Sequence, residues 1–235
     1  MNLNRQIPPP ICPLSDIHVT YPESQRLKNG IPLHVIRAGM EDVVRFDLLI
    51  GAGQWHQTQA LQAMFTNRML REGTSSLTSQ QIAEKLDYYG AMMELSSSVN
   101  CGFITLYSLN KYFPQTIELV ADMLMNPTFP EKEMEVVVEV NKQRFLINST
   151  RVEMMGRKRL NRALFGEAHP LGRYAEVEDY DRLSPEVLRS FYHQHYHSGN
   201  CSIYLSGKIT PEIIQSVERA LGDVPWGKVS HASSF

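Results

Sequence analysis

The sequence lacks several features that mark large classes of protein. Its 235 residues include only three cysteines, which lie far apart and without C-x-x-C spacing: Cys12, Cys101 and Cys201. Such cysteines support neither a disulfide framework nor a cysteine zinc site, and a reducing compartment is the simpler expectation. No apolar run is long enough to cross a bilayer, and prolines interrupt residues 1–13, where a secretion signal would need an apolar stretch.

An excess of charge of one sign is also missing. The chain has 23 basic and 25 acidic residues, which gives a net charge of −2. A chain so close to neutral presents no overall field for phosphate backbones or anionic lipid, so we expect no nucleic-acid and no membrane partner. Sequence repeats and low-complexity tracts are absent as well. Together these absences predict a soluble, cytoplasmic protein.

The composition that remains suits a folded core. Apolar residues make up 43% of the chain and charged residues 20%, enough for one globular unit or two small ones. Strand signals occur in a hairpin around Asn29-Gly30 within Arg26–Ile36, and over Val44–Ile50, Ala91–Ser98, Gly102–Leu109 and Cys201–Leu205. Helical signals cover Ala63–Thr74, Thr78–Tyr89, Phe113–Asn126, Glu131–Arg144, Val152–Leu164, Ser184–His195 and Thr210–Leu221. These segments come in blocks, which predicts the α+β class: an antiparallel or mixed sheet with helices packed mainly on one face.

The helix predicted over Ala63–Thr74 has the frame of a catalytic metal helix without its metal-binding side chains. In the inverted zinc motif H-x-x-E-H, two histidines on one helical face hold the ion and the glutamate polarises the attacking water. Here the three positions read Met64, Asn67 and Arg68. A thioether is a poor zinc ligand, an amide accepts no proton near neutral pH, and a guanidinium has no lone pair to donate. All three roles are lost together.

Several short sequences, in one order, resemble peptidase family M16, the insulinase and mitochondrial-processing-peptidase group of zinc enzymes. They are LKNGIPLHVI at 27–36, MLREGT at 69–74, MLMNPTF at 123–129, HPLGR at 169–173 and YHSGNCSIYLSGKI at 196–209. The resemblance implies an N-terminal arm over residues 1–24, an M16-like N-terminal domain over 25–227, and a tail or the start of an interdomain linker over 228–235. It also implies a second similar domain and an M16-type partner chain, as a homo- or hetero-oligomer.

Carried onto this chain, the resemblance places the family's first histidine on Met64, its glutamate on Asn67 and its second histidine on Arg68. The third ligand, a glutamate, falls on Val140, and a shift of one residue would place Glu139 there. Since zinc catalysis needs about three protein ligands and a water, we expect no metal and no cofactor here, although zinc is expected for the family.

Two side-chain clusters near these positions leave alternatives open. Arg68 either extends into solvent or forms an internal ion pair with Glu133 or Glu139 on the facing helix. The run His193, His195 and His197 has a spacing that invites a metal site. We favour a structural role for these histidines, because the helix ends there and no carboxylate or cysteine lies at close spacing.

The strand after the second helix is where relatives add an extended peptide to a sheet edge. In this chain that position is occupied by Glu94, Leu95, Ser96 and Ser97. Backbone pairing needs no particular side chain, so this edge is the candidate site for an unfolded peptide. The alternative is an edge strand whose polar residues only discourage aggregation.

The leading hypothesis is a non-catalytic M16 homologue that binds peptide or forms part of a chamber beside a catalytically intact partner. One alternative is a zinc-dependent metalloendopeptidase whose ligands are recruited elsewhere or belong to a missing half. The other is a purely architectural subunit. The residues alone leave all three open, and with them the question of whether the chain is an enzyme.

Overall fold

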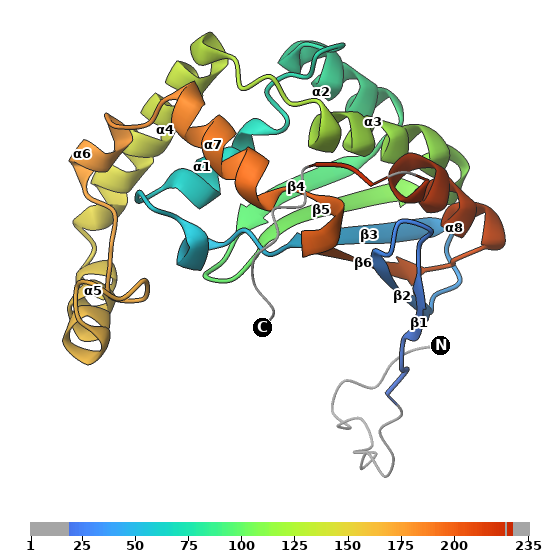
Figure 1. Cartoon of the computed structure of the whole chain (residues 1–235), viewed down its shortest axis with the longest axis horizontal. Helices are drawn as coiled ribbons and strands as arrows, with labels where there is room; N and C mark the ends of the chain where they lie inside the picture. Colours follow the sequence, from blue (N-terminus) through green and yellow to red (C-terminus); the bar gives the residue numbers. More distant parts are fainter. Residues whose placement is uncertain (1–18, 224, 228–235) are drawn as a thin grey trace, which may run out of the picture.

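A mixed β-sheet forms the centre of the molecule (Figure 1), in a computed structural model that describes residues 19–223 and 225–227. Its strands in this range are β1 Glu23–Arg26, β2 Pro32–Arg37, β3 Val43–Ile50, β4 Met92–Ser97, β5 Gly102–Leu109 and β6 Cys201–Gly207. Their order is β1-β2-β6-β3-β5-β4, in which β2 and β6 are parallel and the other neighbours antiparallel. The prediction of a mixed sheet is confirmed, and β4 lies at one edge.

Helices cover one face of this sheet (Figure 1). The helices of the described residues are α1 Gln62–Met69, α2 Ser79–Tyr88, α3 Phe113–Met125, α4 Glu131–Ser149, α5 Val152–Phe165, α6 Val177–Tyr180, α7 Pro185–His195 and α8 Pro211–Val217, of which α5 lies away from the sheet. Strand β3 shows why: Val44, Phe46, Leu48 and Ile50 are fully buried, whereas Arg45 between them is exposed. Alternate side chains point to opposite faces of a strand, so the core lies between the sheet and the helices. None of the described helices combines the length and apolar composition that crossing a bilayer requires.

Most predicted elements are present, and the differences have local causes. The Asn29-Gly30 turn joins β1 to β2, with Gly30 at a φ of 91° that glycine adopts at little cost. Helix α1 ends at Met69 instead of continuing to Thr74, because Thr74 forms a β-bridge with Pro127. The predicted C-terminal helix narrows to α8, and a π-helical turn over Glu218–Gly222 follows it. Residues 1–18 of the predicted arm and the whole tail over 228–235 lie outside the described residues, and β1 already begins at Glu23 within the arm.

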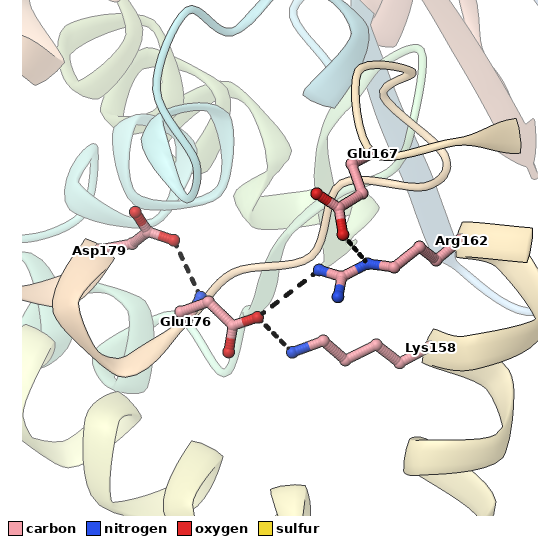
Figure 2. Close-up of polar contacts among 5 residues, drawn as sticks. All are labelled: Lys158, Arg162, Glu167, Glu176 and Asp179. Atoms are coloured by element: carbon pink, nitrogen blue, oxygen red, sulfur yellow. Dashed lines mark hydrogen bonds and ion pairs between the residues drawn. The ribbon is translucent and has the colours of Figure 1, made fainter.

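Helix α5 is attached to the body by charged contacts (Figure 2), by a hydrogen bond from Asn161 to Tyr174 and by stacking of Phe165 on His169. None of its residues is buried. The Glu176 carboxylate accepts a hydrogen bond from Lys158 and lies 3.9 Å from Arg162, whose Nε is 3.1 Å from Glu167. The Glu176 backbone N–H donates to Asp179 at 2.8 Å, which caps the start of α6. One carboxylate therefore joins two turns of α5 to the segment that leads into α6.

Candidate functional site

Helix α1 is fixed between the sheet and α7, against both of which it packs. Its start is held by side chains: Gln57 Oε1 accepts from the Ala63 N–H at 3.3 Å, and Gln62 Nε2 donates to the Val187 carbonyl at 2.9 Å. Phe65 and Met69 are fully buried. The helix therefore has a fixed rotation, which decides where each of the degenerate metal positions points.

The degenerate positions on α1 point in different directions. Asn67 is 1% exposed, whereas Met64 and Arg68, four residues apart on one face, are partly exposed. A Cβ atom at Gly102 would lie 2.7 Å from Asn67 Nδ2 and 3.2 Å from the Tyr196 hydroxyl, so Asn67 points toward β5 and Tyr196. The glutamate position of the family is thus inside the core of this chain.

Asn67 and Tyr196 form a buried polar pair without hydrogen-bond geometry. In the described part of the chain, neither the amide atoms of Asn67 nor the Tyr196 hydroxyl has a hydrogen-bond partner. Burial raises the pKa of Tyr196 far above its usual value, and the nearby Asn67 amide lowers it by less. The hydroxyl therefore stays protonated, and the pair is a structural feature and not an acid or base.

A pocket of about 280 Å³ lies where the C-terminal end of α1 faces α4 and β4. It is lined by Arg68, Arg71, Glu72, Leu95, Val136, Val137, Val140 and Asn141. Two positions that the resemblance assigns to metal ligands, Arg68 and Val140, meet at this pocket. Met64 and Asn67 do not line it.

Arg68 is held by an amide and not by a carboxylate. Its Nη1 donates to Asn141 Oδ1 at 3.1 Å, and Asn141 Nδ2 donates to the Val137 carbonyl at 2.6 Å. Among the described residues no carboxylate lies within ion-pair distance of Arg68, so of the alternatives left open by the sequence the ion pair with Glu133 or Glu139 is not formed. Glu139 is two residues from Asn141 in the sequence, so its side chain points about 200° away from that of Asn141 around the axis of α4. Glu133 lies about two helical turns from Asn141.

The residues around this pocket do not fit a zinc ion. Met64 and Val140 offer no nitrogen or oxygen donor, and Arg68 is a permanent cation. Glu139, the alternative third ligand, is bound to Gln143 at 2.7 Å and does not line the pocket. Across residues 19–223 and 225–227, no group of three or more His, Cys, Asp or Glu side chains could hold a metal ion.

The C-terminal histidines of α7 are packing residues. The His195 ring lies 4.5 Å from the ring of Phe191 and 5.3 Å from that of His56. Burial, with His56 and His197 nearby, lowers the pKa of His195 to about 4, and burial also lowers the pKa of His197. His193 points to solvent. Within the described residues these histidines belong to no group of three or more His, Cys, Asp or Glu side chains that could hold a metal ion.

Strand β4 has an unpaired outer edge within the described residues. The Ser98 N–H donates to the Cys101 carbonyl at 2.7 Å, and the register with β5 continues from Ser97 opposite Gly102. In an antiparallel ladder, pairs that exchange hydrogen bonds alternate with pairs that do not. Ser96 and Glu94 therefore bond to β5, while the backbone groups of Ser97 and Leu95 point to the free edge.

Two residues of the pocket were not found from the sequence. Asn141, next to Val140, carries the amide that receives Arg68, and Arg71 adds a second guanidinium to the lining. The sequence did offer one indication of Arg71: it follows Arg68 by three residues, and residues three apart are neighbours on the surface of a helix. Nothing in the sequence pattern distinguished Asn141 from the other polar residues of α4.

Comparisons with known proteins agree with this geometry. Residues 35–173 match the family profile described as insulinase (peptidase family M16), and residues 182–234 match that of the peptidase M16 inactive domain. An uncharacterized zinc protease, YmxG of Bacillus subtilis, is 24% identical over 199 residues, 83% of this chain and 48% of that protein. Mitochondrial-processing peptidase subunit alpha-1 of Dictyostelium discoideum is 24% identical over 209 residues, 87% of this chain and 32% of that protein.

Solved structures show the same fold. A peptidase M16 inactive domain from Pseudomonas fluorescens superposes with a TM-score of 0.77 at 21% identity, covering 87% of this chain and 52% of that one. The first half of the periplasmic protease PqqL from Escherichia coli gives 0.78 at 16% identity, covering 91% and 48%. This chain spans about half or less of the curated relatives that it matches.

Proposed function

Because the chain belongs to peptidase family M16, we propose that it is a non-catalytic member that holds an extended peptide beside a second M16-type unit. The main observation in support of this proposal is the pocket between α1 and α4. There Arg68 and Val140 occupy the positions that the family resemblance assigns to zinc ligands. A guanidinium repels a metal ion, and a valine offers no donor atom. The zinc-binding geometry is replaced by the contact between Arg68 and Asn141.

The free edge of β4 supports the peptide-binding part of the proposal. An extended peptide adds to a sheet by bonding to outward-pointing backbone groups, which Leu95 and Ser97 supply here. Glu94 and Ser96 are exposed on the sheet face away from the helices. Leu95 of β4 is part of the lining of the pocket, so a peptide bound at this edge lies next to the pocket.

The half-length match supports a second unit. The Dictyostelium relative is a subunit of a processing peptidase, and this chain covers 32% of it. An intact zinc site would come from a partner chain, or from another part of a longer chain. If the zinc site belongs to another part of a longer chain, the whole protein would be a zinc-dependent metalloendopeptidase. This is the second candidate function, and it rests on the same partial coverage of the relative.

Metal analysis and peptide cleavage of the purified chain test the loss of catalysis. We expect no stoichiometric zinc after dialysis against zinc-containing buffer, and no cleavage of unstructured peptides. One zinc per chain together with cleavage by this chain alone would refute the proposal. Adding the chain to an intact homologue should change that homologue's activity or stability, and no change would argue against the partner role.

A pair of variants at one position tests the peptide edge. Ser97→Pro removes an outward N–H while leaving the bonds between β4 and β5 intact, since edge strands tolerate proline. We expect Ser97→Pro to weaken binding of an extended peptide about tenfold. Ser97→Ala keeps the N–H and should bind as the parent does. Equal binding by both variants would place the peptide elsewhere.

A further inference from the structure

The pocket beside β4 contains more positive than negative charge. Its only charged lining residues are Arg68, Arg71 and Glu72. Arg71 Nε lies 3.7 Å from Glu72 Oε1, and Arg68 also interacts electrostatically with Glu72, so this one carboxylate offsets one of the two positive charges. Arg68 is partly buried, bonds to the neutral Asn141, and has no carboxylate within ion-pair distance among the described residues. A guanidinium has five N–H donors, and most of those of Arg68 remain available.

Half of the residues that line the pocket are apolar, and its volume is small. Leu95, Val136, Val137 and Val140 surround the guanidinium groups. A hydrogen bond between a guanidinium and a carboxylate is charge-assisted and therefore stronger than one between neutral groups. At about 280 Å³ the pocket lies just below the range of about 300–1,000 Å³ typical of small-molecule sites, so it suits one side chain of a larger ligand.

The pocket lies beside the edge strand β4, whose Leu95 is part of its lining. Met93 is buried and Leu95 half-buried on the helix side, whereas Met92, Glu94 and Ser96 are exposed on the other side. A peptide added to this edge shares that alternation, so every second side chain points to the helix side. The side chain opposite Leu95 is therefore placed at the mouth of the pocket.

We propose that this pocket binds the carboxylate of an aspartate or glutamate in the peptide held at β4, with Arg68 and Arg71 as the recognising cations. The proposal rests on the proposed function, since it names the class of peptide that the same edge selects. Where the family resemblance predicts a metal cation, this chain would bind an anionic side chain. Arg68 is then a specificity-determining residue, with Asn141 as the residue that positions it.

Fluorescence anisotropy with labelled, end-capped peptides of about ten residues tests this proposal on the full 235-residue chain. The peptides alternate threonine and valine and carry a single glutamate, glutamine or lysine that is moved along the sequence. We expect the best glutamate peptide to bind about tenfold or more tightly than its glutamine counterpart, and the lysine peptide to bind most weakly. A further peptide without glutamate but with a free C-terminal carboxylate shows whether the pocket prefers a side-chain carboxylate or the carboxylate at the end of a peptide.

Matched variants assign the preference to the pocket. Arg68→Gln should bring the affinities for the glutamate and glutamine peptides to within about twofold. Arg159→Gln makes the same change at an exposed position on α5 and should keep the preference. Equal affinities for all peptides, with Ser97→Pro still weakening them, would overturn the charge preference and leave the proposed function standing. A stronger preference for the free terminus would also overturn it, and no binding of any peptide would refute the peptide-binding function itself.

Discussion

Asn67 places a primary amide in the core without a hydrogen-bond partner in the described structure, next to a tyrosine hydroxyl in the same condition. An unsatisfied buried polar group costs about 1–3 kcal/mol. The surrounding structure accommodates the pair through Gly102, because any side chain there would collide with Asn67 Nδ2. This position therefore has a cost in stability that no local contact offsets.

Replacing that amide by an apolar group of similar volume should stabilise the chain. We expect Asn67→Leu to raise the free energy of unfolding by about 1 kcal/mol, measured by urea denaturation. Tyr196→Phe, which removes only the neighbouring hydroxyl, should be neutral or stabilising. A loss of stability in both variants would mean that a buried water bonds to the two groups.

A second effect at the scale of single residues is a dependence on pH. His195 has a folded-state pKa of about 4, against about 6.5 in an unfolded chain, so the unfolded state binds more protons between these values. Stability should therefore fall as the pH decreases from above 6.5 toward 4, by about 1 kcal/mol once solvent screening of the half-exposed ring is allowed for.

Denaturation at pH 7.5 and pH 5 measures this contribution. His195→Phe should reduce the dependence on pH, because phenylalanine does not titrate and can pack against Phe191. His193→Gln changes an exposed histidine two residues away and should leave the dependence as it is. If both variants keep the parent's dependence of stability on pH, another titratable group is responsible for that dependence.

Among the elements, α5 depends most on surface charges. Without a buried residue of its own, it is joined to the rest of the fold through Lys158 and Arg162 at the Glu176 carboxylate (Figure 2). Surface ion pairs contribute about 0–1 kcal/mol each, so α5 should open locally at much lower cost than the sheet.

Glu176→Gln should therefore increase amide hydrogen exchange in α5 and leave exchange in β3 and β5 unchanged. The global free energy of unfolding should fall by less than about 1 kcal/mol. Glu153→Gln is the matched control, since its pair with Arg157 is 3.6 Å long and lies within α5 itself. Increased exchange in the central strands would show that α5 and the sheet unfold together.

Sequence patterns predicted local structure well and the partners of individual side chains poorly. The alternation in β3 depends on neighbours in the chain, and so does the start of α2, which Thr78 caps together with Gln81. The four-residue helix α6 is too short for a helical period to appear. The contact of Arg68 with Asn141 depends on the rotation of α4 relative to α1, which tertiary packing decides.

For the whole molecule, α1 and α4 both line the pocket at which Arg68 and Val140 meet, two positions that the family resemblance assigns to metal ligands. If the two helices are still positioned for a metal, Met64→His, Arg68→His and Val140→Glu together should produce zinc binding, measured by elemental analysis after dialysis. Met64→His with Arg68→His alone should bind zinc far more weakly, because the third ligand is absent. Failure of the triple variant to bind zinc would show that the helices are no longer positioned for a metal.

The position of β6 has a consequence for how the chain is made. Strand β6 lies between β2 and β3, so during synthesis these two strands have no partner between them until residues 201–207 leave the ribosome. Until then the nascent chain carries two separate sub-sheets with bare inner edges, which are prone to pair with other chains. A fragment ending at Asn200 should therefore precipitate where the full chain stays in solution, and the cell would need chaperones to protect this chain late in its synthesis.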